Sequence, residues 1–76
     1  MKKLENKLHP IDFKEEPTVG ELVFSWSLYQ ERWRSYQVIT NDVSVCKVTK
    51  GPKWYVFDLE TGHKTWILVK YLHRGT

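Results

Sequence analysis

The stretch from Lys53 to Leu72 constrains the fold most, because it has the pattern of two β-strands joined by a tight turn. Its first arm, residues 53–59, and its second, residues 64–72, are rich in aromatic and β-branched side chains, which pack well on a pleated sheet. Between them lies a short polar segment in which Gly62 can adopt the positive φ that a tight reversal requires. The pattern predicts a long β-hairpin.

Alternation along the first arm predicts which side chains share a face of this hairpin. Trp54, Val56 and Asp58 lie on one face, and Tyr55, Phe57 and Leu59 lie on the other. The second arm also carries apolar residues on both faces. We therefore expect both faces to be partly covered, as happens when a short sheet curls into a small barrel.

The segments before the hairpin also have strand patterns separated by turn signals. Leu22, Phe24 and Trp26 alternate with polar residues, and Asn41-Asp42 is typical of a turn. Including the hairpin arms, the predicted strands are residues 18–27, 33–40, 43–48, 53–59 and 64–72. Five short strands in a chain of 76 residues predict one all-β domain built as a small five-stranded barrel.

The two ends of the chain lack a clear strand pattern. Residues 1–17 predict a flexible polar arm, because Pro10 breaks any helix running through it. Ile11 and Phe13 are the residues expected to anchor this arm across one open end of the barrel. The globular part is then 18–72, and the tail 73–76 is expected to fray.

Cysteine usage and hydropathy indicate the compartment. Cys46 is the single cysteine and cannot form an internal disulfide. No apolar run approaches the ~20 residues that span a bilayer, and the first residues lack the apolar core of a signal peptide. We expect a cytoplasmic protein that does not contact a membrane.

Three segments carry a resemblance to a known superfold: Val19-Gly20-Glu21-Leu22-Val23, residues 32–38 around a Trp, and the Phe-Asp-x-x-Thr-Gly run within 56–62. Together they resemble the SH3-like small barrels, most closely those of the Tudor and KOW types, over residues 18–72. The resemblance implies a small barrel that binds nucleic acid or peptide. The chain departs from it by an extra basic segment at 49–53 and by lacking a full set of cage aromatics.

The second half of the chain combines positive charge with aromatic rings. Residues 43–76 hold six Lys and Arg against two Asp and Glu, whereas the whole chain has a net charge of +3. Ammonium groups neutralise phosphates and flat rings stack on bases, so this combination suits DNA or RNA. The candidate nucleic-acid-binding residues are Lys47, Lys50, Lys53, Lys64, Lys70, Trp54 and Trp66. The same lysines could instead solvate the surface while the rings fill the core.

The segment between the first two predicted strands is a second candidate site. Trp26, Tyr29 and Trp33 surround it, and Glu31 would favour a cationic guest, so it could bind a peptide or a protein partner. The chain would then be an adaptor or inhibitor, such as a phage- or plasmid-type accessory protein. The alternative is that both tryptophans belong to the core.

Catalytic patterns are weak throughout. The three histidines lie far apart in sequence, and there is no phosphate-binding glycine loop or nucleophile elbow. Asp58, Glu60 and His63 gather at the hairpin tip, where ordinary turn polarity explains them better than a cation site does. We expect a binding module that is not an enzyme and needs no cofactor or metal. The sequence leaves the oligomeric state open.

Overall fold

The computed structural model describes residues 8–46, 48 and 51–75. In this part of the chain six strands form one antiparallel sheet, and no segment is α-helical. The strand order across the sheet is β1-β6-β2-β3-β4-β5. The all-β class is therefore confirmed. The sheet is not closed into a barrel, and it has six strands where the sequence predicted five, so the closed five-stranded barrel is not confirmed.

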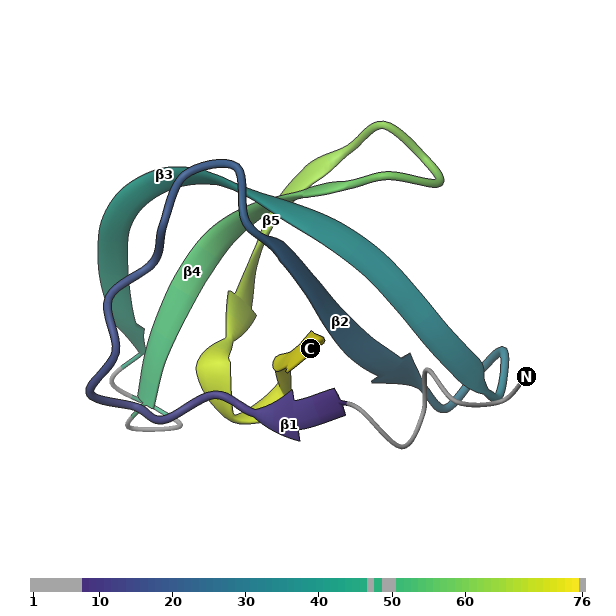
Figure 1. Cartoon of the computed structure of the whole chain (residues 1–76), viewed down its shortest axis with the longest axis horizontal. Coiled ribbons are helices and arrows are strands. Elements are labelled where there is room, and N and C mark those ends of the chain that lie inside the picture. The colour runs from purple at the N-terminus through teal and green to yellow at the C-terminus, as the bar shows by residue number, and fades with distance from the viewer. Residues whose placement is uncertain (1–7, 47, 49–50, 76) are drawn as a thin grey trace.

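The elements follow one another along the chain with short connections, apart from a longer one between the first two strands (Figure 1). They are β1 (Leu8–Pro10), β2 (Leu22–Ser27), β3 (Arg32–Cys46), β4 (Gly51–Asp58), β5 (Lys64–Leu68), the 3₁₀ turn η1 (Val69–Tyr71) and β6 (His73–Gly75).

Strand β3 is a single long strand that replaces two of the predicted ones. Its register with β4 passes from Val38 opposite Val56 to Val43 opposite Trp54, so residues 39–42 all lie across from Tyr55. Such a β-bulge bends its strand and increases the local twist. The predicted turn at 41–42 is therefore wrong: the chain does not reverse there, and Figure 1 shows β3 arching over the molecule instead.

The β4–β5 hairpin confirms the strongest sequence prediction. Asp58 donates its backbone N–H to the carbonyl of His63 at 2.7 Å, and Gly62 donates to the carbonyl of Asp58 at 2.8 Å. Gly62 has a φ of 81°, as the turn requires. The second arm is shorter than predicted, because β5 ends at Leu68 and the chain then turns through η1.

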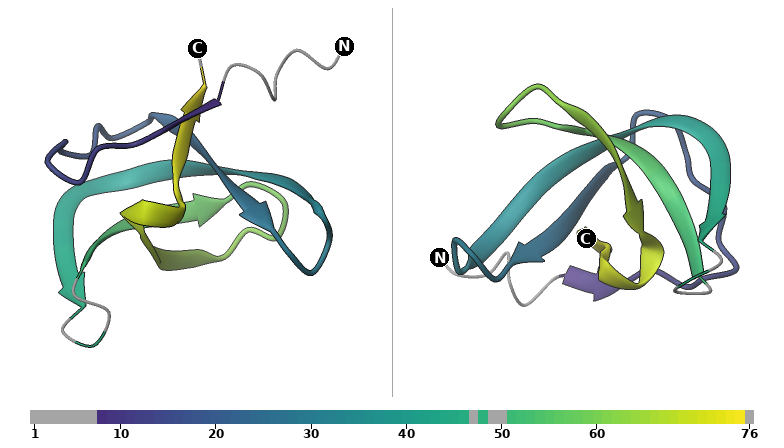
Figure 2. Two further views of the ribbon diagram at one scale, coloured as in Figure 1. Left: turned by 90° about the horizontal axis from the view of Figure 1, so that it is seen from below. Right: turned by 180° about the vertical axis from the view of Figure 1, so that it is seen from behind.

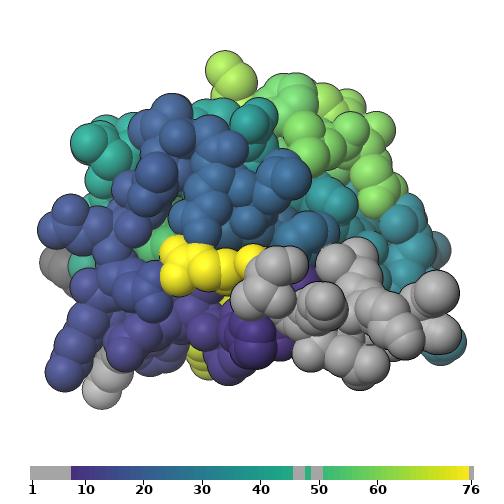
Figure 3. Space-filling model, in the orientation of Figure 1, coloured from purple at the N-terminus to yellow at the C-terminus, as the bar shows by residue number. Residues whose placement is uncertain are grey.

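The chain ends are joined in the sheet. β6 pairs with β1 on one side and with β2 on the other, so the predicted fraying of the tail is wrong for residues 73–75. Figure 2 shows β1 beside β6, and Figure 3 shows β6 enclosed between β1 and the region of β2. A strand that is hydrogen-bonded along both edges has its backbone groups satisfied, which local sequence patterns do not reveal.

The connection from β1 to β2 is fastened by one of its two predicted anchors. Ile11 is buried, and its N–H donates to the carbonyl of Leu72 at 3.3 Å. Phe13 is 55% exposed, so its predicted anchoring role is wrong. One apolar side chain together with a backbone hydrogen bond holds this segment against the sheet.

The core lies on the concave side of the curled sheet. Its buried hydrophobic residues are Ile11, Val23, Val38, Trp54, Val56, Val69 and Leu72. In β2 the inward face is that of Val23, whereas Leu22 and Trp26, on the other face, are 50% and 44% exposed. The alternation predicted for β4 is confirmed, since Trp54 and Val56 are fully buried.

None of the described residues belongs to a helix with the length and apolarity needed to cross a bilayer.

Candidate nucleic-acid interface

The outer face of the β4–β5 hairpin, opposite the core, collects the aromatic and basic side chains of both strands. The register pairs Lys53 with Leu68, Tyr55 with Trp66, and Phe57 with Lys64. Residues directly opposite each other in an antiparallel pair share a face, so these six side chains form one surface. We call the four residues Lys53, Tyr55, Lys64 and Trp66 the platform.

An aromatic pair forms the centre of the platform. The ring centroids of Tyr55 and Trp66 are 4.7 Å apart, and the ring planes are inclined by 33°. This geometry is close to offset stacking, which stabilises an aromatic pair by more than the burial of its surface alone. Trp66 remains 39% exposed, so part of the indole is open to a ligand.

The two lysines lie at opposite ends of this aromatic pair. Lys64 precedes Trp66 by two positions on β5, toward the hairpin loop, and Lys53 precedes Tyr55 by two positions on β4, toward the other end. Among the described residues neither lysine forms an ion pair with a carboxylate. The platform therefore offers two ammonium groups on either side of a flat aromatic surface.

The arginines, by contrast, are occupied within the fold. Arg32 and Arg34 pair with carboxylates at the hairpin tip, and Arg74 of β6 pairs with Glu15 and Glu21. These are the three arginines of the chain. The positive charge available to a ligand in the described structure thus belongs to lysines.

The structure separates the residues that the sequence grouped as one nucleic-acid-binding set. Lys53, Lys64 and Trp66 share the platform. Trp54 is fully buried on the opposite face, so its ring cannot reach a base, and its predicted role in the site is wrong. Lys70 is exposed on η1, where its ammonium lies 5.2 Å from the centroid of the Tyr71 ring.

Two further predicted residues, Lys47 and Lys50, lie outside the described residues. The described strands that flank them, β3 and β4, are paired up to Cys46 opposite Gly51. Because this pairing is antiparallel, the chain changes direction between Cys46 and Gly51.

Tyr55 is the platform residue that the sequence-based site omitted. Alternation places it on the face opposite Trp54, and a five-residue loop between Asp58 and Lys64 places it across from Trp66. Only the alternation was read from the sequence, because the predicted first arm ran to Leu59, one residue beyond the end of β4 at Asp58. Which of the two faces was the buried one could not be read locally, because apolar residues occupy both.

The second predicted site, around the β2–β3 loop, does not form an aromatic cage. Trp26 and Trp33 are opposite each other in the register and meet edge to face, with centroids 5.4 Å apart. Trp33 also meets the ring of His73 edge to face at 5.0 Å. Tyr29 is 97% exposed and belongs to none of these aromatic pairs. The three predicted residues therefore do not surround a common space.

The tip of this loop is nevertheless unusually apolar. Leu28 is 85% exposed beside the almost fully exposed Tyr29. Glu31 has a φ of 55°, in the left-handed region that a residue with a side chain rarely adopts. The loop thus presents two large apolar side chains from a backbone turn that is not optimised for local stability.

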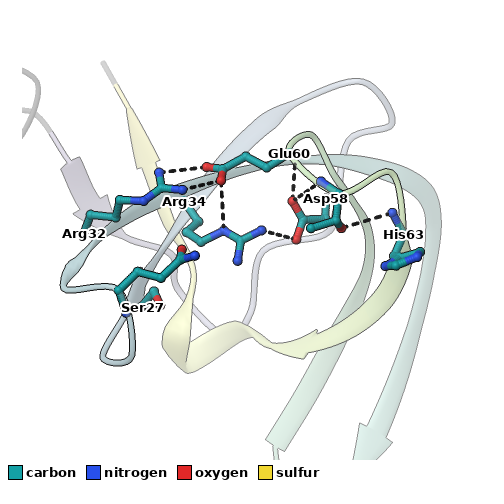
Figure 4. A network of polar contacts seen from close by, with 8 residues as sticks. Ser27, Arg32, Arg34, Asp58, Glu60 and His63 are labelled. Carbon is teal, nitrogen blue, oxygen red and sulfur yellow. Dashed lines mark hydrogen bonds and ion pairs between the residues drawn. The ribbon is translucent and has the colours of Figure 1, made fainter.

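The polar cluster at the β4–β5 hairpin tip is an ion-pair network (Figure 4). Arg32 makes two hydrogen bonds to the carboxylate of Glu60, and Arg34 donates to Asp58. Asp58 also accepts the backbone N–H groups of Glu60 and Thr61, at 2.9 and 3.3 Å. The carboxylates are therefore engaged by arginines from β3.

The ionisation of these carboxylates follows from their partners. Burial by itself raises the pKa of Asp58, but its two backbone hydrogen bonds and the Arg34 guanidinium outweigh this and hold the pKa below its ordinary value. The hydrogen bond from Arg32 lowers the pKa of Glu60. No group of three or more potential metal ligands gathers anywhere in the described part of the chain.

The fold and this surface define an all-β protein with an aromatic and lysine-bearing face on its hairpin. Comparisons with protein-family models, with curated proteins and with solved structures find no match for the chain.

Proposed function

We propose that this protein is a non-enzymatic binding module of the SH3-like small-barrel type, which contacts DNA or RNA through the platform. The observation that carries the proposal is the Tyr55–Trp66 pair on an exposed face between two lysines without carboxylate partners in the described structure. Proteins that bind nucleic acid combine these two elements, because lysines neutralise phosphates and rings stack on bases.

The strand connectivity supports a barrel-like architecture for the module. Strands β2, β3, β4 and β5 are neighbours in chain order, and β6 returns to pair with β2. The sheet order ends at β5 on one side and at β1 on the other, so the sheet is open between these two edge strands, and η1 connects β5 to β6 along the chain. A curled sheet of this kind resembles a small barrel that is open along one seam.

The test of nucleic-acid binding uses a matched pair of charge reversals. Lys64→Glu removes a platform ammonium, and Lys14→Glu makes the same change in net charge at an exposed lysine on the β1–β2 connection. We expect Lys64→Glu to weaken binding of a fluorescein-labelled oligonucleotide about tenfold at low salt, because a phosphate contact becomes repulsive. We expect Lys14→Glu to have a much smaller effect.

Fluorescence anisotropy at two salt concentrations measures both affinities, and circular dichroism checks that the variants are folded. Equal losses in the two variants would mean that net charge matters and the platform does not. The absence of binding by the wild-type protein to any DNA or RNA tested at low salt would refute the proposed function.

A second candidate function is protein binding through the β2–β3 loop, favoured by the exposure of Leu28 and Tyr29. Exposed large apolar side chains at a loop tip are suited to filling a pocket on a partner. On this alternative the chain is an adaptor or inhibitor of another protein.

Replacing both residues, as Leu28→Ser/Tyr29→Ser, tests this alternative without touching the core. If the loop is the contact, the variant should remain folded and lose a partner that co-purifies with the wild-type protein, and raising the salt should weaken that association little. Retention of the partner by this variant would exclude the loop as the contact surface.

A further inference from the structure

The position of Trp66 at the edge of the sheet leaves one face of its ring without an aromatic neighbour among the described residues. β5 is the last strand in the sheet order, and β4 lies on one side of it only. The face of the indole toward β4 packs against Tyr55 at 4.7 Å. The other face is turned toward the side of β5 where no described strand pairs with it, in agreement with the 39% exposure of Trp66.

The opposite end of this two-ring stack faces the neighbouring strand β3 and not an edge of the sheet. Residues 39–42 of the β3 bulge lie across from Tyr55, and Tyr55 is itself half-buried. A further ring is therefore expected to extend the stack beyond Trp66, at the edge strand β5. The geometry allows one additional flat group, placed at the sheet edge.

The lysines indicate what this flat group is attached to. Lys64 and Lys53 lie at the two ends of the stack along the strand direction. A nucleic-acid strand that runs along β5 and stacks one base on Trp66 would bring the phosphates on either side of that base toward these two ammonium groups. Two phosphate contacts are few for a duplex, whose bases are also covered by their neighbours and cannot stack on an indole without being extruded.

We propose that the platform binds single-stranded nucleic acid, with one unpaired base stacked on the open face of Trp66 and the flanking phosphates held by Lys53 and Lys64. This inference rests on the proposed function and specifies its ligand. Stacking of a base on an aromatic ring tolerates any sequence, because every base has a flat face. The platform therefore binds with little sequence preference.

The test compares single strands with and without bases, DNA with RNA, and single strands with a duplex. The protein is titrated with labelled octathymidine, with the corresponding octauridine, with an octamer of the same backbone that is abasic at every position, and with a blunt 12-base-pair duplex. We expect both single strands to bind and the abasic octamer to bind roughly tenfold more weakly. A plot of the logarithm of the binding constant against the logarithm of the salt concentration should have a slope of about −1.4, as expected for two phosphate contacts with a single strand.

Two variants of the same residue give an independent readout. Trp66→Leu removes the ring, whereas Trp66→Phe retains a smaller one, so affinity for octathymidine should fall in the order wild type, Phe, Leu. Affinity for the abasic octamer should be the same in all three proteins. Thermal unfolding of each variant checks that the platform is still folded.

The other possible results would contradict either base stacking alone or both proposals. Equal binding of the intact and abasic octamers, with a loss in Lys64→Glu, would overturn base stacking and leave nucleic-acid binding in place. Tighter binding of the duplex than of either single strand would do the same. Binding of none of the four ligands would overturn both proposals.

Discussion

Asp58 connects the turn of the β4–β5 hairpin to strand β3. It is buried, it is paired with Arg34, and it accepts two backbone N–H groups of the turn that follows it. These bonds satisfy a carboxylate that would otherwise be costly to remove from water. The sequence showed this group as turn polarity, and the structure shows that its role is to fix the turn.

We predict that Asp58→Asn destabilises the protein by about 2 kcal/mol at neutral pH. The amide keeps an oxygen that can accept the backbone N–H groups but loses its charge-assisted bond to Arg34, which is worth about 1.5–3 kcal/mol. Urea unfolding of the two proteins, followed by circular dichroism, measures the difference. A control, Asp12→Asn, removes one exposed carboxylate charge on the β1–β2 connection.

We also predict how the stability difference between the wild-type protein and Asp58→Asn depends on pH. The pKa of Asp58 is lowered in the folded state, so its ionisation stabilises the fold fully at pH values above its ordinary pKa of 3.8. This contribution disappears as the pH falls through the lower folded-state value. The stability difference between wild type and Asp58→Asn should therefore narrow below pH 3.8. A difference that is constant from pH 7 to pH 2 would contradict the assignment.

At the scale of elements, the hairpin and the long strand β3 show what local patterns reveal and what they miss. The β4–β5 hairpin was predictable because alternation and a glycine turn both lie within twenty residues. The bulge in β3 was not, because Asn41 and Asp42 favour a turn locally, and only pairing of β4 with both halves of β3 keeps the chain extended through them. Tertiary pairing outweighed local turn preference.

Gly62 supplies a prediction for the hairpin element. A Cβ at this position would meet no atom within 4 Å, so the cost of Gly62→Ala comes from its φ of 81° alone. We expect a loss of stability of about 1 kcal/mol. Gly62→Asn should cost less, because asparagine tolerates left-handed backbone.

Gly51→Ala is the matched control for this change. Its added Cβ would make an ordinary contact with Leu68 at 3.5 Å, at a position without positive φ. Chemical denaturation of the three variants measures the stabilities. A loss in Gly51→Ala equal to that in Gly62→Ala would show that the backbone conformation of the turn is not the cause.

At the scale of the whole molecule, the sequence did not reveal that the arginines form ion pairs within the fold while the platform lysines have no carboxylate partner in the described structure. The ion pairs of Arg32, Arg34 and Arg74 join positions 24 to 59 residues apart, so no local spacing indicates them. The sequence predicted a basic second half and named Lys53, Lys64 and Trp66 among its candidate residues, and the register of β4 with β5 places these three on one face. It could not tell that Trp54 faces the core, or that β1 and β6 pair and that β5 lies at one edge of the sheet.

The most direct test of nucleic-acid binding at the platform is to map the contact surface on the intact protein. A ¹H–¹⁵N correlation spectrum recorded during titration with octathymidine reports every backbone amide and each indole N–H separately. We predict that the largest changes occur at the platform, at the amides of Lys53, Tyr55, Lys64 and Trp66 and at the Trp66 indole, while the amide of Tyr29 stays unchanged. Changes concentrated in the β2–β3 loop, or none at any residue, would contradict it.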